Sequence, residues 1–273
     1  LARWECGPCL DSGVRVVPGA VRVMESRDQR LDNATVTYVA RADRRSILGD
    51  SCFVSIRGTT NVANWLRNFQ AWKEPVHFPY DGCSGCKAEY GFTTIWNRVK
   101  PGILAALREL GCVPAHEAKG RSYLTGSVYV TGHSMGAAVG TLAMLTLAEL
   151  GYRVRPSYLF ESPRVGNEAF VQAFMRIFNN ETKPMWRVTH AKDPVPDLPP
   201  RILQYRHVEY QVHYSADGTY RQCDIPFDPL CEEGLFDGLR HLTDHCNLSL
   251  TPSMTICGCY GGSESGAGSA MFV

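Results

Sequence analysis

The segment that most restricts how this chain can fold is Gly132-His133-Ser134-Met135-Gly136, because it joins two stretches of different periodicity. Residues 128–131, Val-Tyr-Val-Thr, are rich in β-branched side chains and predict a strand. Residues 137–150 are small and apolar, are followed by Gly151, and predict a helix. A strand that runs straight into a helix needs a sharp turn, in which glycines avoid collisions with the neighbouring elements. The segment therefore predicts a layered α/β fold with Ser134 at the carboxyl end of a sheet.

The rest of the chain continues this alternation of strands and helices. Strands are expected at 14–24, 35–42, 51–57, 158–160 and 187–189, and helices at 92–110 and 168–178. Such alternation indicates a mainly parallel sheet covered by helices on both faces. Pro101 is expected to kink the first helix or divide it in two, and residues 111–126 to form a surface loop. Residues 1–260 then make a single domain, and the Gly/Ser-rich residues 261–273 are expected to be a flexible tail.

Composition is that of an ordinary globular protein, with 44% apolar and 20% charged residues. The formal net charge is only +1, so nothing points to a nucleic-acid partner. No apolar run is long enough for a transmembrane segment. Residues 1–6 have no apolar signal core, so a secreted protein would be present here as its mature chain. We expect a monomer.

The chain has 11 cysteines, more than is typical of a cytosolic enzyme of this size, and most fall in close pairs: Cys6/Cys9, Cys83/Cys86, Cys223/Cys231 and Cys257/Cys259. Disulfides persist in oxidising compartments, so this pattern predicts a secreted, extracellular protein. Zinc is the competing interpretation, because the first two pairs have C-x₂-C spacing. The count is odd, and Cys52, inside an apolar run, is expected to be a buried inert thiol. Three N-x-[ST] sequons are compatible with a secreted glycoprotein: Asn33, Asn180 and Asn247.

Ser134 stands where a nucleophile is held in α/β-hydrolases, which is the fold that a Gly-x-Ser-x-Gly turn between strand and helix indicates. The backbone N–H of Met135 and the following helix N-terminus both favour an anionic tetrahedral intermediate. A serine hydroxyl is a poor nucleophile and needs a base, which in turn needs an orienting carboxylate. In this fold the chain order is serine, acid, histidine.

Two acids and two histidines fit that order. Asp193 follows the expected strand at 187–189 and is favoured over Asp197, which the neighbouring prolines make a candidate for a surface turn residue. Spacing alone leaves His241 and His245 nearly equal as the base. The other histidines in this part of the chain lie in a strand-like stretch and are expected to be structural: His207 and His213.

At this point the sequence resembles the class 3, or fungal-type, triacylglycerol lipases over roughly residues 35 to 258. Five motifs carry the resemblance in the order of the family: residues 56–59 (I-R-G-T), 83–86 with 91–92 (C-S-G-C, G-F), 131–136 (T-G-H-S-M-G), 162–167 (S-P-R-V-G-N) and 189–200 (T-H-A-K-D-P-V-P-D-L-P-P). The resemblance implies Asp193 as the acid and favours His245 over His241 as the base. It also implies Thr59 as a second oxyanion donor, acting with the N–H of Met135.

The same resemblance implies a disulfide between Cys83 and Cys86. The sequence also departs from the family at several points. Glu161 stands where a glycine is usual, and Ala137 replaces another usual glycine. The region before residue 35 does not match well, so the resemblance does not imply the N-terminal helix common in the family.

A short amphipathic segment follows Thr59. Residues 61–69 place four apolar side chains at i, i+3, i+4 and i+7, which is one face of a helix: Val62, Trp65, Leu66 and Phe69. A helix this short depends on what its apolar face is docked against. We expect a lid that covers Ser134 and opens at a lipid surface, as the family resemblance also implies; the alternative is an ordinary core helix.

These residues together predict a secreted, serine-dependent carboxylic ester hydrolase that acts on acylglycerols at a lipid–water interface through an acyl-enzyme, that is, a triacylglycerol lipase. The same triad also suits a phospholipase A or a feruloyl-type esterase, and a non-catalytic lipid-binding relative is the third possibility. No metal or organic cofactor is implied, because every proton transfer has a side chain assigned to it.

Overall fold

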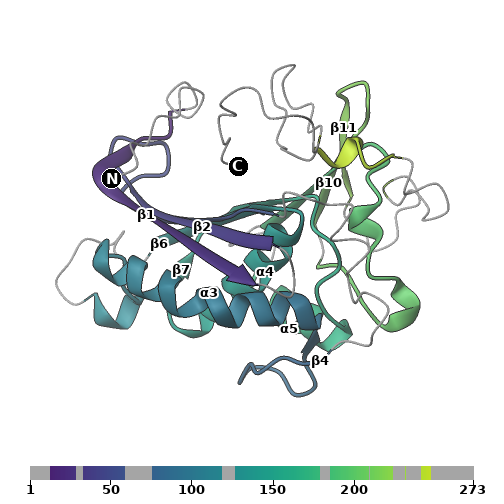
Figure 1. The fold of residues 1–273 in the computed structure, drawn as a ribbon, viewed down its shortest axis with the longest axis horizontal. Helices are drawn as coiled ribbons and strands as arrows, with labels where there is room; N and C mark the ends of the chain where they lie inside the picture. The colour runs from purple at the N-terminus through teal and green to yellow at the C-terminus, as the bar shows by residue number, and fades with distance from the viewer. Residues whose placement is uncertain are drawn as a thin grey trace.

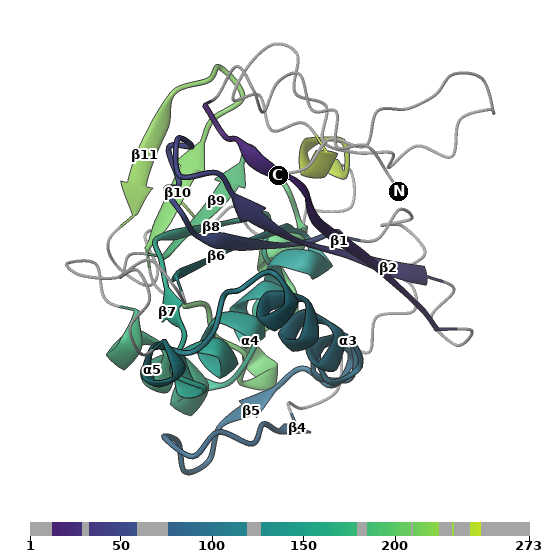
Figure 2. The same ribbon diagram turned by 90° about the vertical axis from the view of Figure 1, so that its left-hand side faces the viewer.

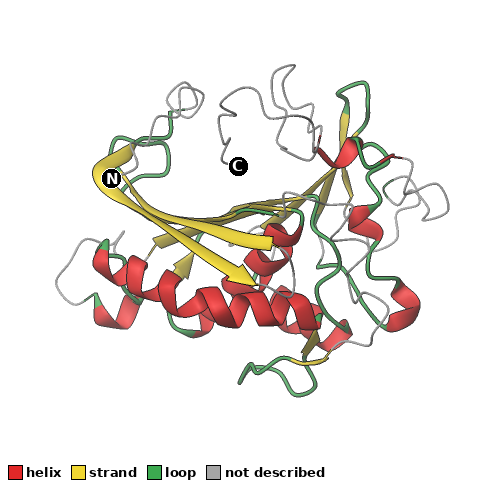
Figure 3. Ribbon diagram, viewed as in Figure 1, coloured by secondary structure: helices red, strands yellow, loops and turns green. Residues whose placement is uncertain are grey.

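The computed structural model describes residues 13–28, 33–58, 76–118, 127–178, 185–208, 210–223, 231 and 241–246. In these ranges one large sheet runs through the molecule with α-helices packed beneath it (Figures 1 and 3). The strands in spatial order are β1 (Val16–Asp28), β2 (Asn33–Ala42), β3 (Cys52–Ile56), β6 (Ser127–His133), β8 (Ser157–Phe160), β9 (Met185–His190), β10 (Gln211–Tyr214) and β11 (Tyr220–Cys223), with β7 (Arg153–Val154) paired to β6. A separate hairpin joins β4 (Val76–His77) to β5 (Lys87–Ala88).

The centre of the sheet is parallel and its edges are antiparallel. β3, β6, β8, β9 and β10 all run the same way, whereas β1, β2 and β11 run against their neighbours. Gly132 pairs with Ile56 on one side and Leu159 on the other, so the carboxyl ends of β3, β6 and β8 meet at one edge. Parallel strands require crossovers, and the connections from β3 to β6, from β6 to β8 and from β8 to β9 contain α3 (Tyr90–Glu109), α4 (Met135–Glu149) and α5 (Glu168–Ile177), respectively. The predicted α/β-hydrolase architecture is confirmed.

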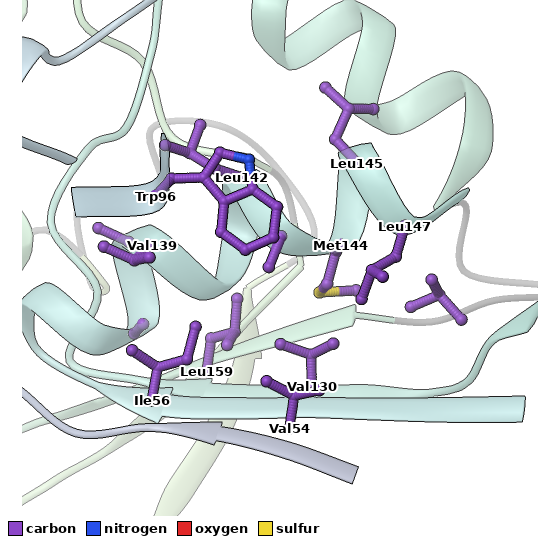
Figure 4. Close-up of a cluster of buried hydrophobic side chains, with 14 of the residues drawn as sticks. Val54, Ile56, Trp96, Val130, Val139, Leu142, Met144, Leu145, Leu147 and Leu159 are labelled. Carbon is purple, nitrogen blue, oxygen red and sulfur yellow. The ribbon is translucent and has the colours of Figure 1, made fainter. Parts of the chain in front are cut away.

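The helices of more than one turn in the described ranges lie on the same side of the sheet (Figures 1 and 2), so the expectation of helices on both faces is not met by them. α3 (Tyr90–Glu109) and α5 both pack against α4, and α4 packs on β3, β6 and β8 (Figure 2). Side chains from α3 and α4, such as Trp96 and Leu142, lie over Val54 and Val130 of the strands (Figure 4). Every residue of α4 from Met135 to Leu147 is buried, which explains why this helix is apolar all round.

The helix α3 is continuous from Tyr90 to Glu109, so the expectation that Pro101 divides it is wrong. Proline removes one backbone hydrogen bond from a helix. The helix is nevertheless anchored on both sides of Pro101, because Trp96 and Val99 before it and Ile103 and Leu107 after it are buried. Burial of these apolar side chains outweighs the local cost of the proline.

The disulfides correct a second expectation. Cys52 is not a free thiol, because it is bonded to Cys112 across 60 residues of chain. That partner follows α3 and is brought back to β3 only by the packing of the helix, so spacing gave no sign of it. The disulfides between Cys83 and Cys86 and between Cys223 and Cys231 are present, which removes zinc as an explanation for Cys83-Ser-Gly-Cys86. The other two close pairs lie outside the described residues: Cys6/Cys9 and Cys257/Cys259.

Some elements differ in length from their expected bounds, and others were not expected. The loop after α3 contains a turn of 3₁₀-helix, η1 (Ala115–Glu117), and the chain after β9 forms η2 (Val195–Asp197), η3 (Arg201–Leu203) and the β10–β11 hairpin. No helix in the described part of the chain combines the length and apolar character needed to cross a membrane. The expected tail at 261–273 lies outside the described ranges.

Candidate active site

Ser134 lies at the turn between β6 and α4, with φ 58° and ψ −129°. Its N–H donates to the carbonyl of Phe160 at 2.9 Å, which fastens the turn to the end of β8. A Cβ on Gly136 would stand 2.0 Å from the carbonyl oxygen of Ile56, and one on Gly132 would stand 2.6 Å from the backbone of Gly136. Neither glycine can be replaced without moving backbone, so the sequence pattern predicted this turn for the right physical reason.

The end of β3 passes directly beside this turn. A Cβ on Gly58 would stand 2.7 Å from the carbonyl oxygen of His133 and 3.1 Å from the Cβ of Ser134. Thr59, expected to be an oxyanion donor, is the next residue and lies outside the described ranges, as do the expected lid residues Val62, Trp65, Leu66 and Phe69. Met135 is the first residue of α4, where backbone N–H groups have no acceptor within the helix.

Asp193 and His245 form a buried pair. His245 Nδ1 donates to Asp193 Oδ2 at 2.6 Å, and their side chains are 0% and 1% exposed. The other Asp193 oxygen accepts from the N–H of Val195 at 2.9 Å, which ties the carboxylate to the first residue of η2. Burial alone would raise the pKa of Asp193, but the charge of His245 and its hydrogen bond outweigh burial, and the pKa lies below its ordinary value. Asp193 is therefore held as a carboxylate, and it orients the ring so that Nε2 is the free nitrogen.

His133 connects this pair to the turn that carries Ser134. Its Nε2 donates to the backbone carbonyl of His245 at 2.8 Å, and the two rings are 4.6 Å apart. Burial, followed by the charge of His245, lowers the pKa of His133 to about 3. Ser134 Oγ and His245 Nε2 are both buried, and neither has a hydrogen-bond partner among the described residues. The structure thus holds an Asp–His pair beside the serine, with the serine–histidine hydrogen bond not formed; such bonds often tighten only when substrate is bound.

The alternative acid and base have other partners. His241 Nδ1 lies 3.7 Å from Asp244 Oδ2. Asp197 Oδ1 lies 3.2 Å from a guanidinium nitrogen of the buried Arg164. The two histidines assigned to structure each hydrogen-bond within the β9–β10 region: His207 to the carbonyl of Pro196 at 2.7 Å, and His213 to Thr189 Oγ1 at 2.9 Å.

Glu161 stands where the family usually has a glycine, and it is the site residue whose role could not be assigned from the sequence. It follows β8 directly and is fully buried. One of its carboxyl oxygens, one Asp193 oxygen and one His245 ring nitrogen lie within 4.8 Å of one another. These three are also the one cluster of possible metal ligands in the described part of the chain. Asp193 and His245 bond directly to each other at 2.6 Å, a distance that leaves no room for an ion between them.

The parallel sheet, the strained serine turn at its carboxyl edge and the neighbouring Asp–His pair define an α/β-hydrolase with the layout of a serine hydrolase. The family model described as "Lipase (class 3)" matches residues 53–203, and the chain belongs to that family.

Among curated relatives, the chain is 34% identical over 218 residues to secreted mono- and diacylglycerol lipase 1 of Fusarium solani, covering 76% of this chain and 58% of that protein. It is 36% identical over 195 residues to secreted mono- and diacylglycerol lipase A of Penicillium cyclopium, covering 71% and 58%. The chain thus spans less than two thirds of the length of these relatives. Among solved structures, the mono- and diacylglycerol lipase of Aspergillus oryzae superposes with a TM-score of 0.66 at 26% identity, covering 88% of this chain and 82% of that one.

Proposed function

We propose that this protein is a secreted, serine-dependent carboxylic ester hydrolase that cleaves acylglycerols at a lipid–water interface. The observation that carries the proposal is the buried hydrogen bond between His245 and Asp193 beside the turn that holds Ser134. A carboxylate that orients a histidine, next to a serine at the start of a helix, is the arrangement of side chains that enzymes use for acyl transfer.

In the proposed reaction Ser134 Oγ attacks the ester carbonyl while His245 Nε2 takes its proton. Asp193 stabilises the imidazolium through the 2.6 Å hydrogen bond. The N–H of Met135, at the first turn of α4, donates to the oxyanion, and Thr59 is proposed as the second donor. His245 then protonates the leaving alcohol, which separates and leaves the acyl group on Ser134. Water, activated by His245, releases the fatty acid.

The acylglycerol part of the proposal has two supports. Relatives over 30% identical are named mono- and diacylglycerol lipases, so partial glycerides are the acylglycerols to test beside triacylglycerols. Residues 61–69 carry the apolar face proposed as a lid, which suits a substrate presented at an interface better than a soluble aromatic ester. The names of these relatives also support secretion, as does the presence of three disulfides in the described part of the chain.

The test combines a mutant with a choice of substrates. In Ser134→Ala, hydrolysis of every ester is expected to fall by about 10⁶-fold, because no nucleophile remains. Ser51→Ala is the matched control, since Ser51 is another buried serine whose hydroxyl donates to the carbonyl of Leu48, away from the turn. A phosphonate ester should phosphonylate Ser134 in the wild type, with loss of its leaving group, and mass spectrometry of peptides should find the added phosphonyl group there. Activity that persists in Ser134→Ala overturns the mechanism.

Substrate class is read by comparing emulsified mono-, di- and triacylglycerols with phospholipid vesicles and with a soluble feruloyl ester. A rate that rises sharply once an acylglycerol exceeds its solubility supports action at an interface. If the phospholipid or the soluble ester is cleaved faster, the acylglycerol assignment is wrong, but the proposed roles of the triad residues still hold. Trp65→Ala is expected to lower the rate on emulsions and to leave the rate on short soluble esters unchanged.

A further inference from the structure

Three neighbouring parallel strands end in a non-glycine residue with positive φ: Ser134 after β6 (58°), Glu161 after β8 (49°) and Ala191 after β9 (46°). Positive φ is unfavourable for a residue with a Cβ and tends to persist where function requires it. Ser134 is the proposed nucleophile, and Ala191 stands two residues before the proposed acid. Glu161 has no part in the mechanism above, although it occupies the strand end between them.

Two independent costs fall on Glu161. Its backbone adopts a conformation that a glycine would adopt freely, and a glycine is what the resembled family usually has there. Its carboxyl group is fully buried, and no described N–H or O–H donates to either oxygen with hydrogen-bond geometry. A buried carboxylate without donors is strongly disfavoured, whereas a carboxylic acid carries a donor of its own. An acceptor is at hand, because a carboxylate oxygen of Asp193 lies within 4.8 Å.

We propose that Glu161 is a positioning residue: as a neutral acid it donates a hydrogen bond to Asp193 and so holds the carboxylate that orients His245. Asp193 then has three supports, namely the N–H of Val195, His245 Nδ1 and the Glu161 hydroxyl. The inference rests on the proposed function, since it gives Glu161 a part only if Asp193 and His245 act on Ser134.

The charges around Glu161 favour the neutral acid. Burial raises the pKa of its carboxyl well above the ordinary value, and the negative charge of Asp193 raises it further. Asp244, on the turn that carries His245, acts in the same direction. The backbone of His190, at the end of β9, opposes this rise without forming a hydrogen bond of good geometry. Among the described residues, the titratable side chains at the ends of these strands also include the imidazoles of His133, His190 and His245 and the cations Arg57 and Lys192, and burial keeps His133 neutral by lowering its pKa.

The assignment has a consequence for pH dependence. When the pH rises through the pKa of Glu161, the proton is lost and two carboxylates face each other at the site. The hydrogen bond to Asp193 is then replaced by repulsion, so kcat is expected to fall on the alkaline side.

The experiment compares Glu161→Gly and Glu161→Gln with the wild type on a short soluble ester, so that the lid plays no part. The glycine fits the positive φ and removes the donor, and kcat is expected to fall about tenfold with KM unchanged. The glutamine amide restores a donor that cannot titrate, so it should recover most of the lost kcat and abolish the alkaline limb of the pH profile. A wild-type alkaline limb that Glu161→Gln leaves in place overturns the proposal.

Two further measurements separate the proposal from a purely structural role and from failure of the function itself. When Asp193→Asn is already present, adding Glu161→Gly should lower kcat no further. The proposal is overturned if Glu161→Gly lowers kcat equally with and without Asp193→Asn. It is also overturned if a further loss in the double variant shows that Glu161 takes the place of Asp193. Infrared spectra of the substrate-free wild type should contain the carbonyl stretch of a protonated carboxylic acid, and this band should disappear in Glu161→Gln. A wild-type spectrum without the band overturns the proposal. If Ser134→Ala stays active, the proposed function has failed instead.

Discussion

His133 Nε2 lies 2.8 Å from the backbone carbonyl oxygen of His245, and the two imidazole rings are 4.6 Å apart. A carbonyl oxygen only accepts, so His133 must carry its proton on Nε2 and donate. The residue next to the proposed nucleophile therefore holds the short helix η5 (Asp244–Cys246) that presents the proposed base. Placement of His245 depends on this hydrogen bond as well as on Asp193.

Removal of that donor should loosen His245. In His133→Leu the carbonyl of His245 stays buried without its partner, which costs about 1–3 kcal/mol. We expect kcat on a soluble ester to fall about tenfold, since part of that cost falls on the alignment of the base. His116→Leu is the control, because the His116 side chain is 70% exposed and away from the site. Equal kcat in the two variants would show that His245 is held by other contacts.

The same histidine should make the fold sensitive to acid. Burial is the largest cause that lowers the pKa of His133 from 6.5 to about 3. Between these two pH values the unfolded chain binds a proton that the folded chain refuses, so the free energy of unfolding falls as the pH is lowered from 6.5 towards 3. The loss reaches at most about 5 kcal/mol for this group. Urea titrations at several pH values should show a shallower acid loss in His133→Leu than in the wild type.

How far the sequence could predict the site depended on whether the information was local. The turn at Ser134 was predictable because two glycines, a strand and a helix lie within a few residues of it. Asp193 was expected to follow a strand, and it lies three residues after the end of β9. His241 and His245 could not be distinguished by spacing, because they are only four residues apart. The contacts of His245 with His133 and Asp193, which only the folded structure shows, distinguish the two.

Long-range pairings account for what the sequence could not supply. Cys52 looked like an inert thiol, because its partner Cys112 approaches only after the intervening chain has folded. Glu161 stood out as a charged residue in a glycine position, but its neighbour Asp193 lies after the next strand of the sheet, β9. The helix was not divided at Pro101, because local backbone preference was outweighed by apolar burial on both sides of it.

Gly136 should tolerate no side chain. A Cβ there would stand 2.0 Å from the carbonyl oxygen of Ile56, so Gly136→Ala must push β3 away from α4 at the site. We expect Gly136→Ala to yield little soluble protein, and the soluble fraction to lose phosphonate labelling at Ser134. In Gly140→Ala, one turn further along α4, the new Cβ meets side-chain atoms alone: Leu159 Cδ2 at 3.0 Å, which can shift, and Val130 Cγ1 at an ordinary contact distance of 3.5 Å. Gly140→Ala should therefore keep its labelling; if both variants label at the wild-type rate, close packing at the turn is not required.

The disulfides should stabilise the fold to different extents, according to the length of the loop that each one closes. Cys52 and Cys112 are 60 residues apart, and loss of such a cross-link raises the conformational entropy of the unfolded chain, which lowers the free energy of unfolding by about 4 kcal/mol. Cys83 and Cys86 are only 3 residues apart, so their bond restricts the unfolded chain far less. We expect the double alanine variant of the first pair to unfold at a much lower temperature than that of the second. Similar melting temperatures would show that native packing, not chain entropy, sets their contribution.

Asp197 should prove to be a structural residue and Asp193 a functional one, although only four positions separate them. The side chains of Arg164 and Asp197 are 4% and 15% exposed, and Arg164 also donates to the carbonyl oxygens of Asp197 and Pro199, which ties down the turn after Asp193. Asp197→Asn removes the charge opposite Arg164 and is expected to lower the free energy of unfolding by about 2 kcal/mol, with kcat changed less than about threefold.

Asp193→Asn should show the opposite pattern, with kcat reduced about 10⁴-fold because the amide no longer holds the imidazole in its working tautomer. Its free energy of unfolding should change less than that of Asp197→Asn, because an asparagine oxygen can still accept from the N–H of Val195. Urea unfolding and soluble-ester kinetics on the two variants check both statements. A severe loss of kcat in Asp197→Asn with Asp193→Asn still active would exchange the two roles and remove Asp193 from the proposed triad.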